Sequence, residues 1–171
     1  MDHWVTTMPE IPDFLNHLPV EPRRKLPVPF TNIITESGEP DFTTIDAQKT
    51  VECALLRLCG VCGKKLSYWI AFLGGPQSAE SRAYLDPPMH EECARAAVKL
   101  CPFIAMPSMA RRKTPLTRDS TYPEGWTADR PEVFVLYITR KFKCRVPHHD
   151  SVIFLPAPAS RIEVLEETRS Q

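Results

Sequence analysis

The chain has 171 residues, of which 43% are hydrophobic and 25% charged, as in a globular protein large enough to bury a core. Lys and Arg together number 21, as do Asp and Glu, so no overall basic charge calls for a nucleic-acid or membrane partner. No apolar run approaches the ~20 residues of a transmembrane helix, and the N-terminal residues do not resemble a signal peptide. We therefore expect a cytoplasmic protein whose cysteines are free or bind metal.

Proline is the compositional outlier, with 18 residues against 6 glycines. Proline fixes φ and biases the preceding residue toward extended geometry, so residues 1–31, which hold six prolines, are predicted to form a proline-rich extended arm. Its interleaved apolar residues suggest packing against the rest of the chain or against a partner. Residues 32–165 are predicted to form a single domain, and residues 166–171 a frayed polar tail.

A first helix is predicted over residues 44–59, with Asp46 or Thr44 as its N-cap and Gly60 at its exit. Its apolar side follows the i, i+3, i+4, i+7 spacing of an amphipathic helix and consists of Val51, Ala54, Leu55 and Leu58. Next, residues 66–73 read as a strand. The sequence predicts a bend at residues 74–76 and a returning strand over residues 82–85, which together make a β-hairpin.

A second helix is predicted over residues 91–100, ended by Pro102. Residues 102–131 read as irregular. Alternating or continuous apolar patterns then predict strands over residues 133–146, 152–155 and 162–165. The predicted fold class is α+β: a treble-clef-like zinc core of knuckle, β-hairpin and helix, with an added helix and a C-terminal antiparallel sheet.

Two pairs of metal-ligand residues, each with two intervening positions, flank the predicted hairpin: Cys59 and Cys62, then His90 and Cys93. Gly60 and Gly63 permit the dihedrals of a tight knuckle, while the second pair shares a face of the first helical turn. A Cys3His set fills all four positions of a tetrahedral zinc ion, so we predict one structural Zn²⁺ per chain and no catalytic residues. The alternative is two unrelated pairs of buried residues.

The other cysteines, Cys53, Cys101 and Cys144, are interpreted as buried thiols. Residues His148, His149 and Asp150 form either a solvated turn or a second metal or acid–base site. No partner is visible in the sequence for His17.

Two basic clusters could bind a nucleic-acid backbone or a protein partner. They consist of Arg111, Arg112 and Lys113, and of Arg140, Lys141, Lys143 and Arg145. The last three alternate along a predicted strand and share a face, close in sequence to Tyr137, Phe142 and Trp126. The alternative is a solvated basic face that the acidic residues Glu163, Glu166 and Glu167 balance.

Several segments resemble a family of small uncharacterised proteins of bacteria and their phages. They are Pro27-Val28-Pro29-Phe30, Cys59-x2-Cys62-Gly63, Gly75-Pro76, Pro87-Pro88-x-His90-x2-Cys93-Ala94, Cys101-Pro102-Phe103 and Pro107-x-Met109-x-Arg111-Arg112. The resemblance implies a phage or mobile-element setting and no particular reaction.

These observations favour a small, non-catalytic zinc-binding protein, an accessory or regulatory protein that binds a protein or a nucleic acid and needs no small-molecule cofactor. The alternative is a metal-dependent hydrolase, most plausibly a divergent treble-clef nuclease. Such nucleases use a general-base histidine on the hairpin, and residues 67–85 contain no histidine.

Overall fold

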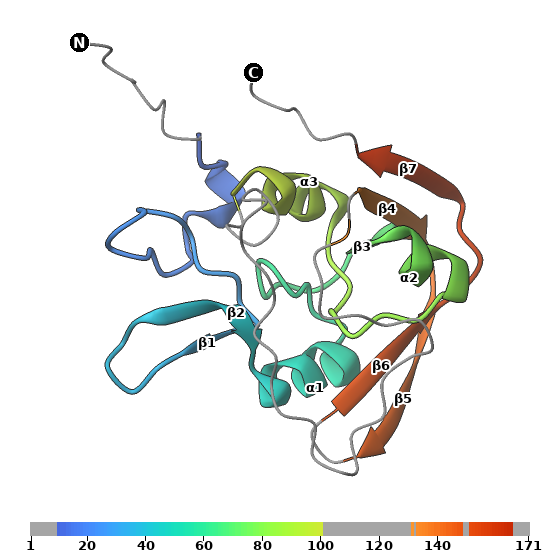
Figure 1. Ribbon diagram of the computed structural model, residues 1–171, viewed down its shortest axis with the longest axis horizontal. Helices are drawn as coiled ribbons and strands as arrows, with labels where there is room; N and C mark the ends of the chain where they lie inside the picture. The colour runs from blue at the N-terminus through green and yellow to red at the C-terminus, as the bar shows by residue number, and fades with distance from the viewer. Residues whose placement is uncertain (1–9, 101–130, 132, 149–150, 166–171) are drawn as a thin grey trace.

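The computed structural model describes residues 10–100, 131, 133–148 and 151–165, and shows a mixed α and β fold with antiparallel sheets (Figure 1). A short 3-10 helix, η1 (Asp13–Leu15), comes first, followed by the paired strands β1 (Asn32–Ile34) and β2 (Pro40–Ile45). Among the described residues no helix is both long and apolar enough to cross a bilayer.

Helix α1 (Ala47–Leu56) begins at Asp46, whose carboxylate accepts hydrogen bonds from the backbone N–H groups of Gln48 and Lys49, so the predicted N-cap is confirmed. The predicted exit at Gly60 is wrong, because Arg57 ends the helix in the left-handed conformation at φ 55°.

The predicted apolar face of α1 is only partly right. Val51 and Ala54 pack on the core beside the buried Thr50 and Cys53. Leu55, however, is 77% exposed and so is not part of the packed face.

Strand β3 (Ile70–Gly74) does not form the predicted hairpin with residues 82–85. The chain instead enters helix α2 (Pro76–Ser81), with Gly75 as N-cap and Pro76 in the first turn, where a missing N–H costs no hydrogen bond. Among the described residues between α2 and the next helix, the backbone of Met89 pairs with β3, through two hydrogen bonds with Ala71 of 2.8 and 2.9 Å.

Helix α3 (Glu91–Leu100) has the predicted bounds. The single strand predicted over residues 133–146 is two strands, β4 (Phe134–Thr139) and β5 (Phe142–His148), separated by Arg140 and Lys141. The C-terminal strands β6 (Ser151–Pro156) and β7 (Arg161–Leu165) follow.

The predicted C-terminal sheet is divided between two sheets. One has the strand order β3-β4-β7 and the other pairs β5 with β6. β3 is therefore joined to a strand more than sixty residues later, with Ile70 opposite Thr139 and Gly74 opposite Val135.

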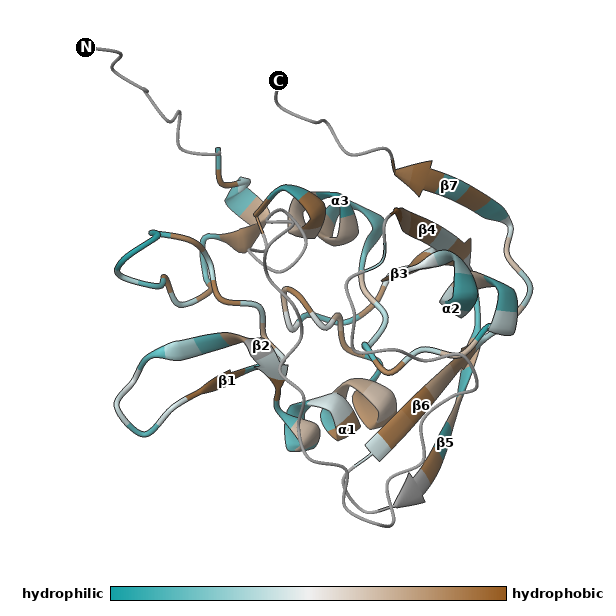
Figure 2. Ribbon diagram, in the orientation of Figure 1, coloured by the Kyte–Doolittle hydropathy of each residue, from teal (hydrophilic) through white to brown (hydrophobic). Residues whose placement is uncertain are grey.

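The β3–β4 pair separates two hydrophobic clusters. Ala71, Leu73 and Leu136 face the cluster formed with α3 and the N-terminal segment, which contributes Leu15 and Leu18. The alternate residues Phe72 and Tyr137 face the second cluster, toward β6 and α1. Burial on both faces explains why β3 and β4 are hydrophobic along their length rather than alternating (Figure 2).

Helix α3 is tied to β7 by an ionic network as well as by apolar packing. Arg95 donates two hydrogen bonds to the Glu163 carboxylate, at 3.1 and 2.6 Å, and one to Glu91 at 3.0 Å. Arg161 binds the same two carboxylates, and its hydrogen bond, followed by that of Arg95, lowers the pKa of Glu91. The network fixes the start of α3, where the candidate metal ligands lie.

Candidate metal centre

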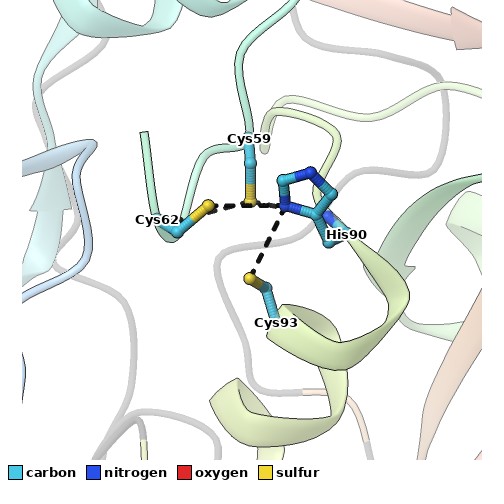
Figure 3. Close-up of side chains that lie close together, drawn as sticks. All are labelled: Cys59, Cys62, His90 and Cys93. Carbon is cyan, nitrogen blue, oxygen red and sulfur yellow. Dashed lines mark hydrogen bonds between the residues drawn. The ribbon is translucent and has the colours of Figure 1, made fainter. Parts of the chain in front are cut away.

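The two predicted ligand pairs converge at one point. The ligand atoms of Cys59, Cys62, His90 and Cys93 all lie within 4.8 Å of one another, and the four side chains point inward (Figure 3). The three cysteines are buried, and the histidine is half-buried. This cluster could hold a metal ion.

The loop between Cys59 and Lys65 places the first pair. Cys59 N–H donates to the carbonyl of Lys64 at 2.8 Å, and Gly63 N–H donates to the carbonyl of Cys59 at 2.9 Å, which folds the loop back on itself. The backbone N–H groups of Cys62 and His90 point at the Cys59 sulfur, at 3.5 and 3.4 Å. These donors stabilise a thiolate at this position.

The two glycines of this loop have different roles. Gly63 adopts φ +74°, and a Cβ there would also lie 2.9 Å from the Phe30 ring, so the predicted need for glycine is confirmed. Gly60 has no positive φ. Its place is explained by Pro87, two of whose ring atoms would lie 3.1 Å from a Cβ at residue 60.

The second pair comes from the residue before α3 and from its first turn. Nδ1 of His90 lies 3.4 Å from the Cys62 sulfur and 3.8 Å from the Cys93 sulfur. Nε2–H of the same ring donates to the carbonyl of Lys65 at 2.9 Å. Because a neutral imidazole carries one proton, this hydrogen bond leaves the Nδ1 lone pair facing the sulfurs.

The three sulfurs affect one another's ionisation. Hydrogen bonds from Cys62, from Cys93 and from the two backbone N–H groups lower the pKa of Cys59 well below that of a free thiol. Hydrogen bonding to Cys59 and Cys62 raises the pKa of Cys93. Three adjacent thiolates repel one another, so a cation among them is needed to stabilise all three charges.

Sequence reasoning missed the contribution of the N-terminal segment to this site. Nε2–H of His17 donates to the carbonyl of Cys62 at 2.7 Å. Phe30 N–H binds the carbonyl of Val61, and Thr31 binds the carbonyl of Gly60 through both its N–H and its hydroxyl. No sequence spacing signals these contacts, since each partner is an unspecific backbone carbonyl.

The remaining predicted sites have different outcomes. Cys53 is buried as expected, and burial raises its pKa to about 12, so it stays a neutral thiol. The prediction for Cys144 is wrong: its thiol is exposed on β5. Cys101, Arg111, Arg112 and Lys113 lie outside the described residues, as do His149, Asp150 and the side chain of His148.

The second basic cluster is exposed, and it does not have the expected aromatic neighbours. Arg140, Lys141, Lys143 and Arg145 lie at the end of β4 and along β5. Tyr137 is 2% exposed and Phe142 packs on the second hydrophobic cluster, so neither presents a free ring. Trp126 lies outside the described residues.

No protein-family model matches the sequence, and comparisons with curated proteins and with solved structures find no similar protein. The chemistry of the site therefore carries the functional inference.

Proposed function

We propose that Cys59, Cys62, His90 and Cys93 bind one structural Zn²⁺ and that the protein acts by binding a macromolecular partner rather than by catalysis. The observation that carries this proposal is the convergence of four metal-ligating side chains on one point. Following the family resemblance, we propose that the protein is an accessory or regulatory protein of phages or mobile elements.

The donor set and its dimensions fit zinc. With Zn–S near 2.3 Å and Zn–N near 2.05 Å, tetrahedral coordination requires sulfur–nitrogen separations of about 3.6 Å. The separations from Nδ1 of His90 to Cys62 and Cys93, 3.4 and 3.8 Å, lie on either side of this value. The Lys65 carbonyl would orient the imidazole by accepting its Nε2–H, as carbonyl and carboxylate oxygens do for zinc-bound histidines. A bound zinc would supply folding free energy.

The chain around the site supports a treble-clef-like description. A cysteine knuckle is followed by β3, by a return to β3 at Met89 and by a helix that begins beside two ligands. The Ala71–Met89 bridge would take the place of the second hairpin strand. Helix α2 is inserted between β3 and Met89, and this insertion would account for the shortness of the pairing at Met89.

Four protein ligands favour a structural role over a catalytic one. A tetrahedral ion with three thiolates and one imidazole keeps no position for a water or a substrate. A hydrolytic zinc site would need such a position, and residues 67–85 offer no histidine as a base. The zinc would thus organise the knuckle, β3 and α3, and the surfaces carried by these elements would contact the partner.

Metal analysis tests the proposal most directly. Protein purified without added metal and assayed by inductively coupled plasma mass spectrometry should contain one zinc per chain. Replacement by Co²⁺ should give the intense visible bands of a tetrahedral cobalt–thiolate site. A well-folded, metal-free preparation would contradict the metal assignment, and zinc-dependent cleavage of nucleic acid by pure protein would contradict the non-catalytic role.

A further inference from the structure

Two segments of this neutral chain, which the pairing of β3 with β4 brings together, carry basic residues but no acidic ones. Residues 53–79 contain Arg57, Lys64 and Lys65, and residues 133–148 contain the four cations of the second basic cluster. Neither segment contains an Asp or a Glu. The two segments together carry +7 (3 plus 4), so the rest of the chain carries −7.

All seven cations are exposed, and no salt bridge joins any of them to a described carboxylate. Glu163, one of the acidic residues expected to balance the basic strand, binds Arg95 and Arg161 instead. Within the described residues, these cations are therefore not neutralised by ion pairing.

Two exposed aromatic rings lie next to one of these cations, Arg140. Tyr68 is 64% exposed and Trp69 is 44% exposed, although they directly precede β3, whose first four residues are buried. Their rings meet edge to face, with centroids 5.1 Å apart and an interplanar angle of 87°. Large rings that stay exposed beside a buried strand are candidates for contact with a partner.

Arg140 holds the aromatic pair in place. Its Nη1 donates a hydrogen bond of 2.6 Å to the Tyr68 hydroxyl, and its guanidinium lies 5.6 Å from the centre of the same ring. The pairing of Ile70 with Thr139 puts Trp69 and Arg140 at the same end of the two strands. We call Tyr68, Trp69, Arg140 and Lys141 the aromatic–basic patch.

Further cations continue from the patch along β5. Lys143 and Arg145 share a face of this strand, two residues and therefore about 7 Å apart. A row of cations can contact the phosphates of a flexible polyanion, and the exposed rings at its start can stack on that polyanion's bases. Unpaired bases have free faces, whereas those of a duplex are covered by their neighbours.

We propose that the aromatic–basic patch binds single-stranded nucleic acid. Trp69 and Tyr68 stack on bases, while Arg140 and Lys141 contact phosphates and Lys143 and Arg145 extend the contact along the strand. This inference names the partner class for the binding role proposed above and rests on it.

The test uses the zinc-loaded full-length protein and a fluorescein-labelled oligodeoxythymidine 20-mer, followed by fluorescence anisotropy across a salt series. We expect binding that weakens steeply with salt and a weaker interaction with duplex of the same length. Trp69→Ala should weaken binding about 5- to 150-fold, the range found for loss of a stacked base, whereas Trp69→Phe should retain most of the affinity.

Two arginine variants separate a patch effect from a general charge effect. Arg140→Ala should weaken binding and reduce the salt slope by about 1. Arg23→Ala, which removes an 81% exposed arginine from another part of the chain, should leave the affinity for the oligonucleotide unchanged. Circular dichroism and zinc content should be the same for all variants.

Failure of this inference can be told apart from failure of the proposed function. Protein with one zinc per chain that does not bind the oligonucleotide at low salt would overturn the nucleic-acid assignment alone. Binding to polyglutamate but not to the oligonucleotide would likewise overturn it, and would assign the patch to acidic protein segments. Equal losses in Arg140→Ala and Arg23→Ala would show non-specific charge attraction and contradict a site at the patch.

Discussion

Replacement of Cys62 by serine removes one ligand from the proposed zinc site while nearly preserving the shape of the side chain. Structural zinc contributes about 10–16 kcal/mol to the folding of small zinc modules. Divided equally among four ligands, this gives about 2.5–4 kcal/mol for each. For a chain of this length, 1 kcal/mol corresponds to about 2–4 °C in Tm, so Cys62→Ser should lower Tm by about 5–16 °C.

The experiment combines thermal unfolding, followed by circular dichroism, with measurement of bound zinc. The wild-type protein should lose more stability than the substitution costs when a chelator removes its metal. The same chelator should cost Cys62→Ser less than it costs the wild type, because part of the zinc contribution is already lost in the variant. This lack of additivity distinguishes loss of a ligand from a simple packing defect.

The chain offers two matched controls for this substitution. Cys144→Ser alters an exposed thiol on β5 and should change neither Tm nor zinc content. Cys53→Ala alters a cysteine that is 0% exposed, like the ligand Cys59. Cys53 lies outside the four-residue cluster. Cys53→Ala should cost about 1 kcal/mol, typical of a single substitution, and keep one zinc per chain.

A Cys62→Ser protein that retained one zinc per chain and melted within about 2 °C of wild type, less than the effect of 1 kcal/mol, would refute the ligand assignment. Loss of zinc from Cys53→Ala would also refute it, because the metal would then depend on a thiol outside the proposed set.

Two further predictions concern the loop that carries the first ligand pair. Gly63→Ala should cost about 2–4 kcal/mol in urea denaturation, because φ +74° is strained for alanine and the Phe30 ring must also move. The control is Gly38→Ala, at φ +83° with open space around it, which should cost only the backbone strain of about 1–2 kcal/mol. If Gly63→Ala cost no more than Gly38→Ala, the Phe30 ring would not restrict residue 63. His17→Ala should lower stability by about 1 kcal/mol through loss of its hydrogen bond to the Cys62 carbonyl, with zinc content unchanged. An unaltered urea midpoint would mean that water replaces the imidazole at no cost.

Local patterns in the sequence predicted local structure well. The carboxylate of Asp46 caps α1, and the bounds of α3 at Glu91 and Leu100 are those predicted. Capping and helical periodicity involve residues within a few positions of one another, so they are visible without knowledge of the rest of the chain. The pairing of ligands two residues apart is local in the same sense, and the convergence of Cys59, Cys62, His90 and Cys93 agrees with it.

Predictions that depended on distant partners were less successful. The pairing of β3 with β4 displaced the hairpin predicted with residues 82–85, and the chain in between formed α2. Leu55 and Cys144 were both expected to be buried, and both are exposed. Apolar character shows that a residue can be buried, but burial requires a neighbouring element on the same side.

The amino-acid sequence alone therefore determined the candidate ligand cluster and the helix that carries its last residue, Cys93. Tertiary structure decided which strands meet, that His17 supports the knuckle and that Tyr68 and Trp69 stay exposed beside Arg140. The physical reason is the range of the interactions involved. Caps, turns and ligand spacing act within a few residues, whereas strand pairing and burial depend on residues that are remote in the chain and meet only in the folded protein.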